Sequence, residues 1–163
     1  MILIEQHAPA EAAPSERLVL PFEKRCKSRL RCTLESGEEC GLFIERGSVL
    51  RGGTRLLAGD GRVVEVVAAL ERLMDVSSVE PQQISRAAYH LGNRHVAVEL
   101  RHGGLRFAAD NVLGDMVRGL GLDVSEIEAP FEPESGAYGA HPHGHSADGE
   151  GRGPRIHDRF LRR

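Results

Sequence analysis

The residues of this sequence best suited to chemistry are histidines, which gather in two places. Three alternate with other residues near the C-terminus, as His141, His143 and His145, and another, His95, closes the segment 86–95. Imidazole nitrogen binds nickel, copper and zinc well, and alternating histidines on a flexible chain are a compositional sign of metal binding. With an ordinary pKa of about 6.5, these groups are largely neutral at neutral pH, so acid should release the metal.

The histidines of the segment 86–95, which are His90 and His95, and those near the C-terminus also have simpler interpretations. His90 is as well suited to packing beside a metal site as to binding the metal itself. His95, taken alone, is a surface histidine, and the three C-terminal histidines fit a solvated linker. One imidazole is a poor metal site, but a twofold axis would bring the imidazoles of two chains together. The remaining histidines stand alone and are expected to be ordinary surface residues: His7, His102 and His157.

Residues 1–73 are expected to form a small all-β domain. Leu30, Cys32 and Leu34 alternate with polar residues, a period of two that is typical of a half-buried strand. Glycine-containing turns separate further short runs of this kind, and no stretch has a useful helical period. The arginines and glutamates scattered over 11–31 are interpreted as a solvated face.

Residues 74–132 change character and predict the order β-α-β-β-α-β, the split arrangement of ferredoxin-like domains. Pro81 suits a first helical turn, and Gly92-Asn93 should end that helix because both residues tolerate the left-handed conformation. Asp110 suits the N-cap of the second helix. The predicted strands cover 73–79, 96–100, 105–109 and 124–129. His95 stands at the start of the second strand and points to the face opposite a core-facing set: Val96, Val98 and Leu100.

Residues 133–163 are rich in Gly, Pro, Ser, His and charge, so they predict a flexible tail. The fold class is therefore α+β, with a small β domain, a ferredoxin-like domain and a His-containing tail. A net charge of −3 argues against a nucleic-acid binder. No membrane span or leader peptide is evident, which favours the cytoplasm. The cysteines 26, 32 and 40 lack C-x-x-C spacing, and Cys32 is interpreted as a buried strand residue.

The segment 86–95, Arg-Ala-Ala-Tyr-His-Leu-Gly-Asn-Arg-His, resembles the signature of the urease accessory protein E family. Gly-Ala-Tyr-Gly, which leads into the His-containing tail, agrees with the same family. The resemblance covers nearly the whole chain, although only these two segments are strong motifs.

The resemblance implies a non-enzymatic nickel metallochaperone. It implies a homodimer joined through the ferredoxin-like domains, in which His95 of each subunit binds one Ni(II) at the interface. Zn(II) or Cu(II) would compete for the site, and His141, His143 and His145 would add ligands or load further ions. The β domain would bind a peptide or partner, and the recipients would be the urease accessory GTPase and the urease apoprotein complex.

Two features depart from that family pattern. Some relatives carry histidines near the start of the second helix, where this chain has Ala109 and Asn111, and the tail histidines are few. The alternatives are a general nickel or zinc buffer unconnected to urease, an RNA-binding ferredoxin-like module and a metal-dependent hydrolase. The RNA-binding and hydrolase readings lack their motifs, namely an RNP pattern and an H-E-x-x-H cluster.

Overall fold

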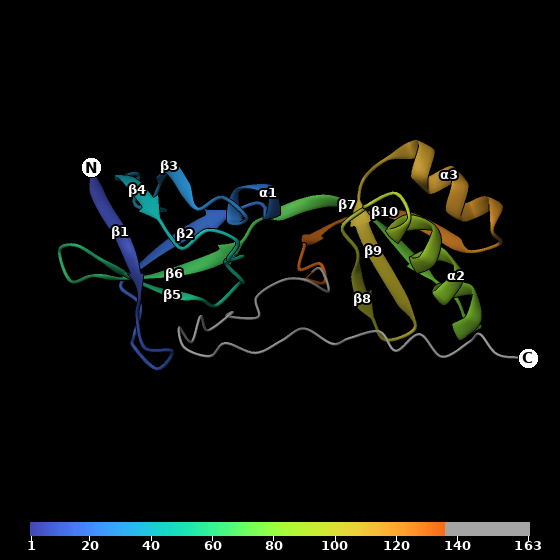
Figure 1. Cartoon of the computed structure of the whole chain (residues 1–163), viewed down its shortest axis with the longest axis horizontal. Coiled ribbons are helices and arrows are strands. Elements are labelled where there is room, and N and C mark those ends of the chain that lie inside the picture. The colour runs from blue at the N-terminus through green and yellow to red at the C-terminus, as the bar shows by residue number, and fades with distance from the viewer. Residues whose placement is uncertain (136–163) are drawn as a thin grey trace, which may run out of the picture.

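The computed structural model describes residues 1–135, which form two β-sheets arranged end to end along the long axis of the molecule (Figure 1). The first sheet has six strands and the second has four. Strand β7 (Leu70–Ser77) leads out of the first unit and becomes an inner strand of the second sheet. The prediction of a mixed α+β protein with a mostly-β first part is confirmed.

The N-terminal sheet surrounds a core of aliphatic side chains because its strands alternate between buried and exposed residues. Leu34 is buried, and Leu30 and Cys32 pack partly buried against that core, as their alternation predicts. The strand order is β2 (Glu16–Leu20), β6 (Val63–Ala68), β5 (Arg55–Ala58), β1 (Ile2–His7), β4 (Glu39–Phe43) and β3 (Arg29–Thr33).

Two features of this unit differ from the sequence-based expectation. A four-residue helix, α1 (Phe22–Arg25), follows β2, although no helical period is visible there. Arg25 at its end is fully buried, whereas all charged residues of 11–31 were expected to face solvent. The structure shows why that expectation was wrong for this one residue: partners from distant parts of the chain satisfy its guanidinium group, and they include Glu132.

The C-terminal unit runs in the order strand, helix, strand, strand, helix, strand, and its sheet order is β10-β7-β9-β8. Side chains from both helices and from one face of the sheet form its core, so both helices cover the same face. Its further elements are α2 (Pro81–Gly92), β8 (Glu99–Arg101), β9 (Gly104–Ala108), α3 (Asn111–Gly119) and β10 (Asp123–Pro130).

The predicted helix starts are confirmed. Pro81 occupies the first turn of α2, and the Asp110 carboxylate accepts a hydrogen bond of 2.9 Å from the backbone N–H of Leu113, as an N-cap does. The strand predicted over 96–100 is shorter than expected, since only Glu99–Arg101 pairs with β9. Val96 and Val98 pack against the core as predicted.

The core position predicted for Leu100 is wrong, because 52% of its surface is exposed. β8 is a short edge strand at the end of the sheet. Leu100 therefore lies at the margin of the helix-covered core, beside an open hollow that it shares with Val98.

Candidate metal site

His95 lies at the C-terminal end of α2, in the turn that reverses the chain toward β8. The backbone N–H of Val96 donates to the carbonyl of Leu91 (3.2 Å), and that of His95 donates to the carbonyl of Gly92 (2.9 Å). These six-to-one and five-to-two bonds define a Schellman motif, in which the residue at the position of His95 must be left-handed. Leu91 and Val96 both belong to the core, which supplies the apolar contact typical of the motif.

The backbone of His95 is left-handed, with a φ of 55°, and among residues 1–135 it is the only non-glycine residue with a positive φ. A Cβ makes this conformation costly, and glycine normally occupies the position. The helix stop predicted at Gly92-Asn93 is confirmed, but the left-handed residue is His95 and not one of these two. Asn93 is right-handed, with a φ of −62°, and the bonded turn continues to His95 before the chain reverses.

The imidazole of His95 is exposed beside a hollow with a volume of about 480 Å³. The helix end, the segment leading into β8 and two residues beyond β10 form its wall. The lining residues are Ala88, Gly92, His95, Val96, Ala97, Val98, Leu100, Glu134 and Ser135. His95 is thus exposed and lies outside the core of its own unit, as the sequence predicts.

His90 lies one turn earlier on α2 and is half-buried. Its ring meets the Tyr89 ring edge to face, with 5.4 Å between the centroids. The Arg94 guanidinium donates a hydrogen bond of 2.9 Å to the His90 backbone carbonyl, which holds the helix end together. Tyr89 itself is 66% exposed, so an aromatic surface lies on the same helix end as His95.

Within residues 1–135, no group of three or more His, Cys, Asp or Glu side chains is arranged to hold a metal ion. His95 is therefore a single candidate ligand in the described part of one chain. His141, His143 and His145, predicted as further ligands, lie outside the described residues. His7 lies in β1 and His102 in the turn between β8 and β9, and both are exposed.

The sequence analysis did not predict the pairing of Cys32 and Cys40. The two residues face each other across the β3–β4 hairpin, with their sulfur atoms 3.2 Å apart. Burial raises the pKa of the Cys32 thiol, and burial together with the hydrogen bond to Cys32 raises the pKa of Cys40 to about 12. The signal was present in the sequence, since both cysteines lie four residues from Ser36 in the turn.

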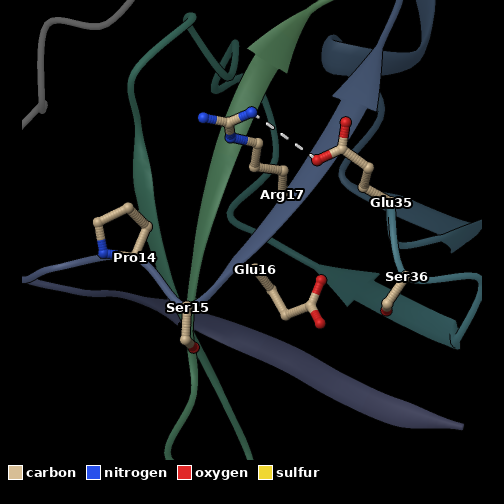
Figure 2. A pocket seen from close by; sticks show the side chains of 6 residues that line it. All are labelled: Pro14, Ser15, Glu16, Arg17, Glu35 and Ser36. Atoms are coloured by element: carbon tan, nitrogen blue, oxygen red, sulfur yellow. Dashed lines mark ion pairs between the residues drawn. The ribbon is translucent and has the colours of Figure 1, made fainter.

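Another hollow, in the N-terminal unit, has no histidine or cysteine among its lining residues (Figure 2). Arg17 lies on one side of it and Glu35 on the other, with their charged atoms 3.9 Å apart. The pair is exposed, and the backbone N–H of Glu35 also donates to the carbonyl of Arg17 (2.9 Å). These contacts tie β2 to the β3–β4 hairpin and give the hollow a structural explanation.

These features define a class of protein: a two-unit chain with a β-sheet N-terminal unit and a helix-covered second sheet. One exposed imidazole is fixed at a helix end in the second unit. The chain belongs to the UreE urease accessory protein family. Residues 2–69 match the family model for the UreE urease accessory protein N-terminal domain, and residues 71–158 match the model for its C-terminal domain.

Curated relatives support the same membership. The urease accessory protein UreE of Azotobacter vinelandii is 47% identical over 166 residues that cover 100% of both chains. That of Cupriavidus necator is 52% identical, over 86% of this chain and 73% of the relative. That of Nitrosospira multiformis is 50% identical, over 86% of this chain and 81% of the relative. In the part of the chain that the structure describes, no helix is both long and apolar enough to cross a membrane.

Proposed function

We propose that this protein is a nickel metallochaperone that binds Ni(II) through His95 and delivers it to apo-urease through the urease maturation complex. The observation that carries the proposal is the imidazole at the end of α2. It is exposed and held in a left-handed position that suits glycine better than histidine. Backbone strain of this kind is typical of functional sites. The relatives are named urease accessory proteins, which supports urease as the recipient.

A homodimer completes the site in this proposal. A single imidazole binds metal weakly, and a twofold interface places the same residue of two chains side by side. Leu100, which lines the same hollow as His95, and Tyr89, which lies in the last turn of α2, are exposed and supply apolar surface for such an interface. The element order and the sheet order β10-β7-β9-β8 support a ferredoxin-like domain as the dimerisation unit.

The metal in this proposal is a cargo, so the site must release it. Imidazole ligands suit nickel, and they also bind zinc and copper, which compete. His141, His143 and His145 complete the coordination from the C-terminal segment and leave stepwise as the ligands of the recipient arrive. Protons compete with the metal for imidazole nitrogens, so acid favours release of the metal.

We divide the molecule functionally into residues 1–73, which bind a partner, residues 74–132, which bind metal and dimerise, and residues 133–163, which carry the additional histidines. Leu3, Val19 and Phe43 are exposed apolar residues of the N-terminal sheet and support a docking role. The proposed partner is the urease accessory GTPase, and the proposed location is the cytoplasm. No catalytic step is assigned to the chain.

Nickel titration by calorimetry, with the molecular mass measured in parallel, tests this proposal. His95→Asn is the informative variant, because asparagine accepts the left-handed conformation but removes the imidazole. We expect the parent to bind one tight nickel ion per two chains and the variant to lose that site while remaining a dimer. A variant that keeps the tight site, or a monomeric parent, contradicts the proposal.

The second candidate is a general nickel or zinc buffer, which has the same site but no urease partner. Binding of the nickel-loaded protein to the urease accessory GTPase separates the two. Specific binding, together with faster activation of apo-urease than free nickel gives, supports delivery. Tight nickel binding without either effect favours the buffer.

A further inference from the structure

The β3–β4 hairpin of the N-terminal unit carries two free cysteines at directly opposite positions. Cys32 of β3 and Cys40 of β4 are partners in the strand register, and their sulfur atoms lie 3.2 Å apart. Opposite Cα atoms in an antiparallel pair are about 4.5–5.5 Å apart, which lies within the range of about 4.4–6.8 Å that a disulfide spans. The S–S bond is about 2.05 Å long, so the two sulfur atoms need to approach each other by only about 1 Å.

Hydrogen bonds around the pair hold the two strands of the hairpin in register. At the turn, the backbone N–H of Leu34 donates to the carbonyl of Glu38 (2.9 Å), and that of Gly37 donates to the carbonyl of Leu34 (2.9 Å). Gly37 has a φ of 90°, which glycine adopts without strain. Between the strands, the guanidinium of Arg31 donates to both carboxylate oxygens of Glu39 (2.9 and 2.8 Å). The fold therefore brings the two thiols together before any bond joins them.

The two thiols have different surroundings. Cys32 is half-buried, whereas Cys40 is fully buried in the core of the N-terminal unit. Burial raises the pKa of the Cys32 thiol, but the hydrogen bond with Cys40 and the charge of Lys24 act in the opposite direction. Burial and the same hydrogen bond raise the pKa of Cys40 to about 12. Because the thiolate is the reactive form, Cys32 is the sulfur that an oxidant attacks first.

The packing around Cys40 decides which oxidised product fits. The interior of a protein is close-packed, and extra atoms in a core cause strain. A sulfinic acid at Cys40 would add two oxygen atoms and a charge at a site with no exposed surface. A disulfide removes two hydrogen atoms and adds nothing. The disulfide is therefore the oxidised form that this core accommodates.

We propose that Cys32 and Cys40 are a reversible redox site, at which hydrogen peroxide converts the two thiols into an intrachain disulfide and a dithiol reductant restores them. The Cys32 thiolate attacks one peroxide oxygen, so that an S–O bond forms, the O–O bond breaks and hydroxide leaves. The proton that Cys32 released converts this hydroxide to water. The Cys40 sulfur then attacks the Cys32 sulfur: the S–S bond forms, the S–O bond breaks, and the hydroxyl group leaves as water with the Cys40 proton.

The balance of the reaction is one peroxide and two thiols, which give one disulfide and two water molecules. In the reverse direction, a thiolate of the dithiol attacks the disulfide, and the dithiol is itself oxidised to a disulfide. Disulfides in a reducing compartment are usually transient and redox-sensing. The site is independent of the proposed nickel role, because both thiols belong to the N-terminal unit. Oxidation would thus cross-link the hairpin in the unit that we assign to partner binding.

The first test counts free thiols by mass spectrometry in metal-free protein with a chelator present. Cys26→Ser leaves Cys32 and Cys40 as the only thiols of the chain. After treatment with hydrogen peroxide and alkylation in denaturant, we expect no alkylated thiol, a mass lower by two hydrogen atoms and a single chain on a non-reducing gel. Dithiothreitol should restore both thiols. Oxygen atoms retained on the sulfurs, or a disulfide that joins two chains, would overturn the proposal.

Two controls accompany this test. In the unsubstituted protein, the exposed Cys26 should be oxidised under the same conditions, which shows that the peroxide is active. If Cys26 is oxidised while Cys32 and Cys40 stay free, the proposal is wrong. Cys26→Ser combined with Cys40→Ala leaves Cys32 without a partner thiol, so a sulfenic acid should accumulate there and react with dimedone. A Cys32 thiol that stays unmodified in this variant contradicts its role as the sulfur oxidised first.

The second test asks whether the disulfide fits the native hairpin. Amide hydrogen exchange is measured by NMR on reduced and oxidised Cys26→Ser protein. Exchange at Leu34, whose N–H donates within the hairpin, should be at least about tenfold slower after oxidation, because the cross-link restricts the opened hairpin. Leu113 is the control, since its N–H is bonded in the C-terminal unit and should exchange at the same rate in both forms. Unchanged or faster exchange at Leu34 overturns the proposal.

Discussion

His95 occupies a backbone position that a glycine would occupy at lower energy. Its φ of 55° allows the helix to end in a Schellman motif, and the Cβ of a histidine crowds the backbone in this conformation. A side chain kept at such a position serves something other than the stability of the helix end. The imidazole, which is exposed next to an open hollow, is the part that glycine lacks.

His95→Gly should therefore raise the free energy of unfolding by about 1 kcal/mol. This value is the backbone strain that the substitution relieves, less the cost of the greater conformational entropy that glycine gives the unfolded chain. The same variant should lose the proposed nickel site. Urea unfolding of the metal-free protein measures the first effect and nickel titration the second. His95→Ala is the control, because alanine keeps the Cβ and should give no stabilisation. A destabilised His95→Gly protein would show that the histidine ring itself supports the fold.

At the scale of elements, the starts of both helices and the end of α2 at Gly92 were predictable, but the left-handed residue that follows α2 was not. Pro81 and Asp110 act through their own turns, so a local pattern is sufficient to find them. The helix ends at Gly92 and Asn93 as predicted, but the left-handed conformation is adopted by His95, next to Val96, which packs against the core. His95 as a candidate ligand was predictable from its segment. Its backbone conformation and its place in the same hollow as Glu134 and Ser135 depend on tertiary contacts.

The Asp110 cap gives a test within α3. Asp110→Ala removes the carboxylate that accepts a hydrogen bond from the Leu113 N–H, so it should lower the free energy of unfolding by about 1 kcal/mol. Asp115→Ala in the same helix is the matched control, since Asp115 is exposed and pairs only with Arg118. Its effect should stay below about 0.5 kcal/mol. Equal effects in thermal unfolding would show that the cap contributes no more than a surface charge.

The β3–β4 hairpin predicts an order of thiol reactivity. Cys26 is exposed, whereas Cys32 is half-buried and Cys40 is fully buried with its pKa raised to about 12. Burial also raises the pKa of the Cys26 thiol, and because the thiolate is the reactive form, alkylation of Cys26 should be slow. Cys26 should still react before Cys32 and Cys40, because it is the exposed cysteine. Mass spectrometry after alkylation at neutral pH should show one modified thiol in the folded protein and three in denaturant. Early modification of Cys40 would mean that the hairpin opens readily.

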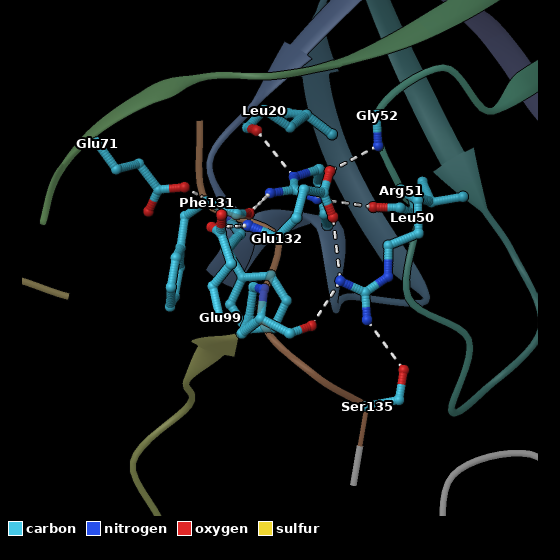
Figure 3. A network of polar contacts seen from close by, with 12 residues as sticks. Leu20, Leu50, Arg51, Gly52, Glu71, Glu99, Phe131, Glu132 and Ser135 are labelled. Carbon is cyan, nitrogen blue, oxygen red and sulfur yellow. Dashed lines mark hydrogen bonds and ion pairs between the residues drawn. The ribbon is translucent and has the colours of Figure 1, made fainter. Parts of the chain in front are cut away.

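At the scale of the whole molecule, the Glu132 carboxylate is a central partner in the junction between the units, because it accepts hydrogen bonds from Arg25, Arg51 and Gly52 (Figure 3). Glu132→Gln leaves the buried Arg25 without its negative partner, so we expect a loss of roughly 2 kcal/mol in the free energy of unfolding, less than a fully buried pair would lose. Glu39→Gln, which breaks an exposed ion pair, should have almost no effect. Chemical denaturation of both variants measures the difference. A Glu132→Gln protein as stable as the parent would show that the remaining carbonyl partners satisfy Arg25.

The same carboxylate predicts a pH dependence. The pKa of Glu132 is lower in the folded protein than in the unfolded chain, so its contribution is complete above the ordinary glutamate pKa of about 4.3 and is lost as the pH falls through the lower, folded value. As the pH falls, the junction between the units should therefore open before the two hydrophobic cores unfold. Hydrogen exchange at Glu134, followed from neutral to acidic pH in parent and Glu132→Gln, should show an acid-induced opening in the parent alone.

The junction could not be derived from the sequence, because no local pattern links residues 107 positions apart. That separation has a consequence for the order of synthesis. Arg25 leaves the ribosome early, but Phe131 and Glu132, which complete its hydrogen bonds, follow more than 100 residues later. The first unit therefore emerges with an arginine whose hydrogen bonds are incomplete until Phe131 and Glu132 have been made. Its final packing must wait until almost the entire chain has been made, so the two units mature together although each has its own core.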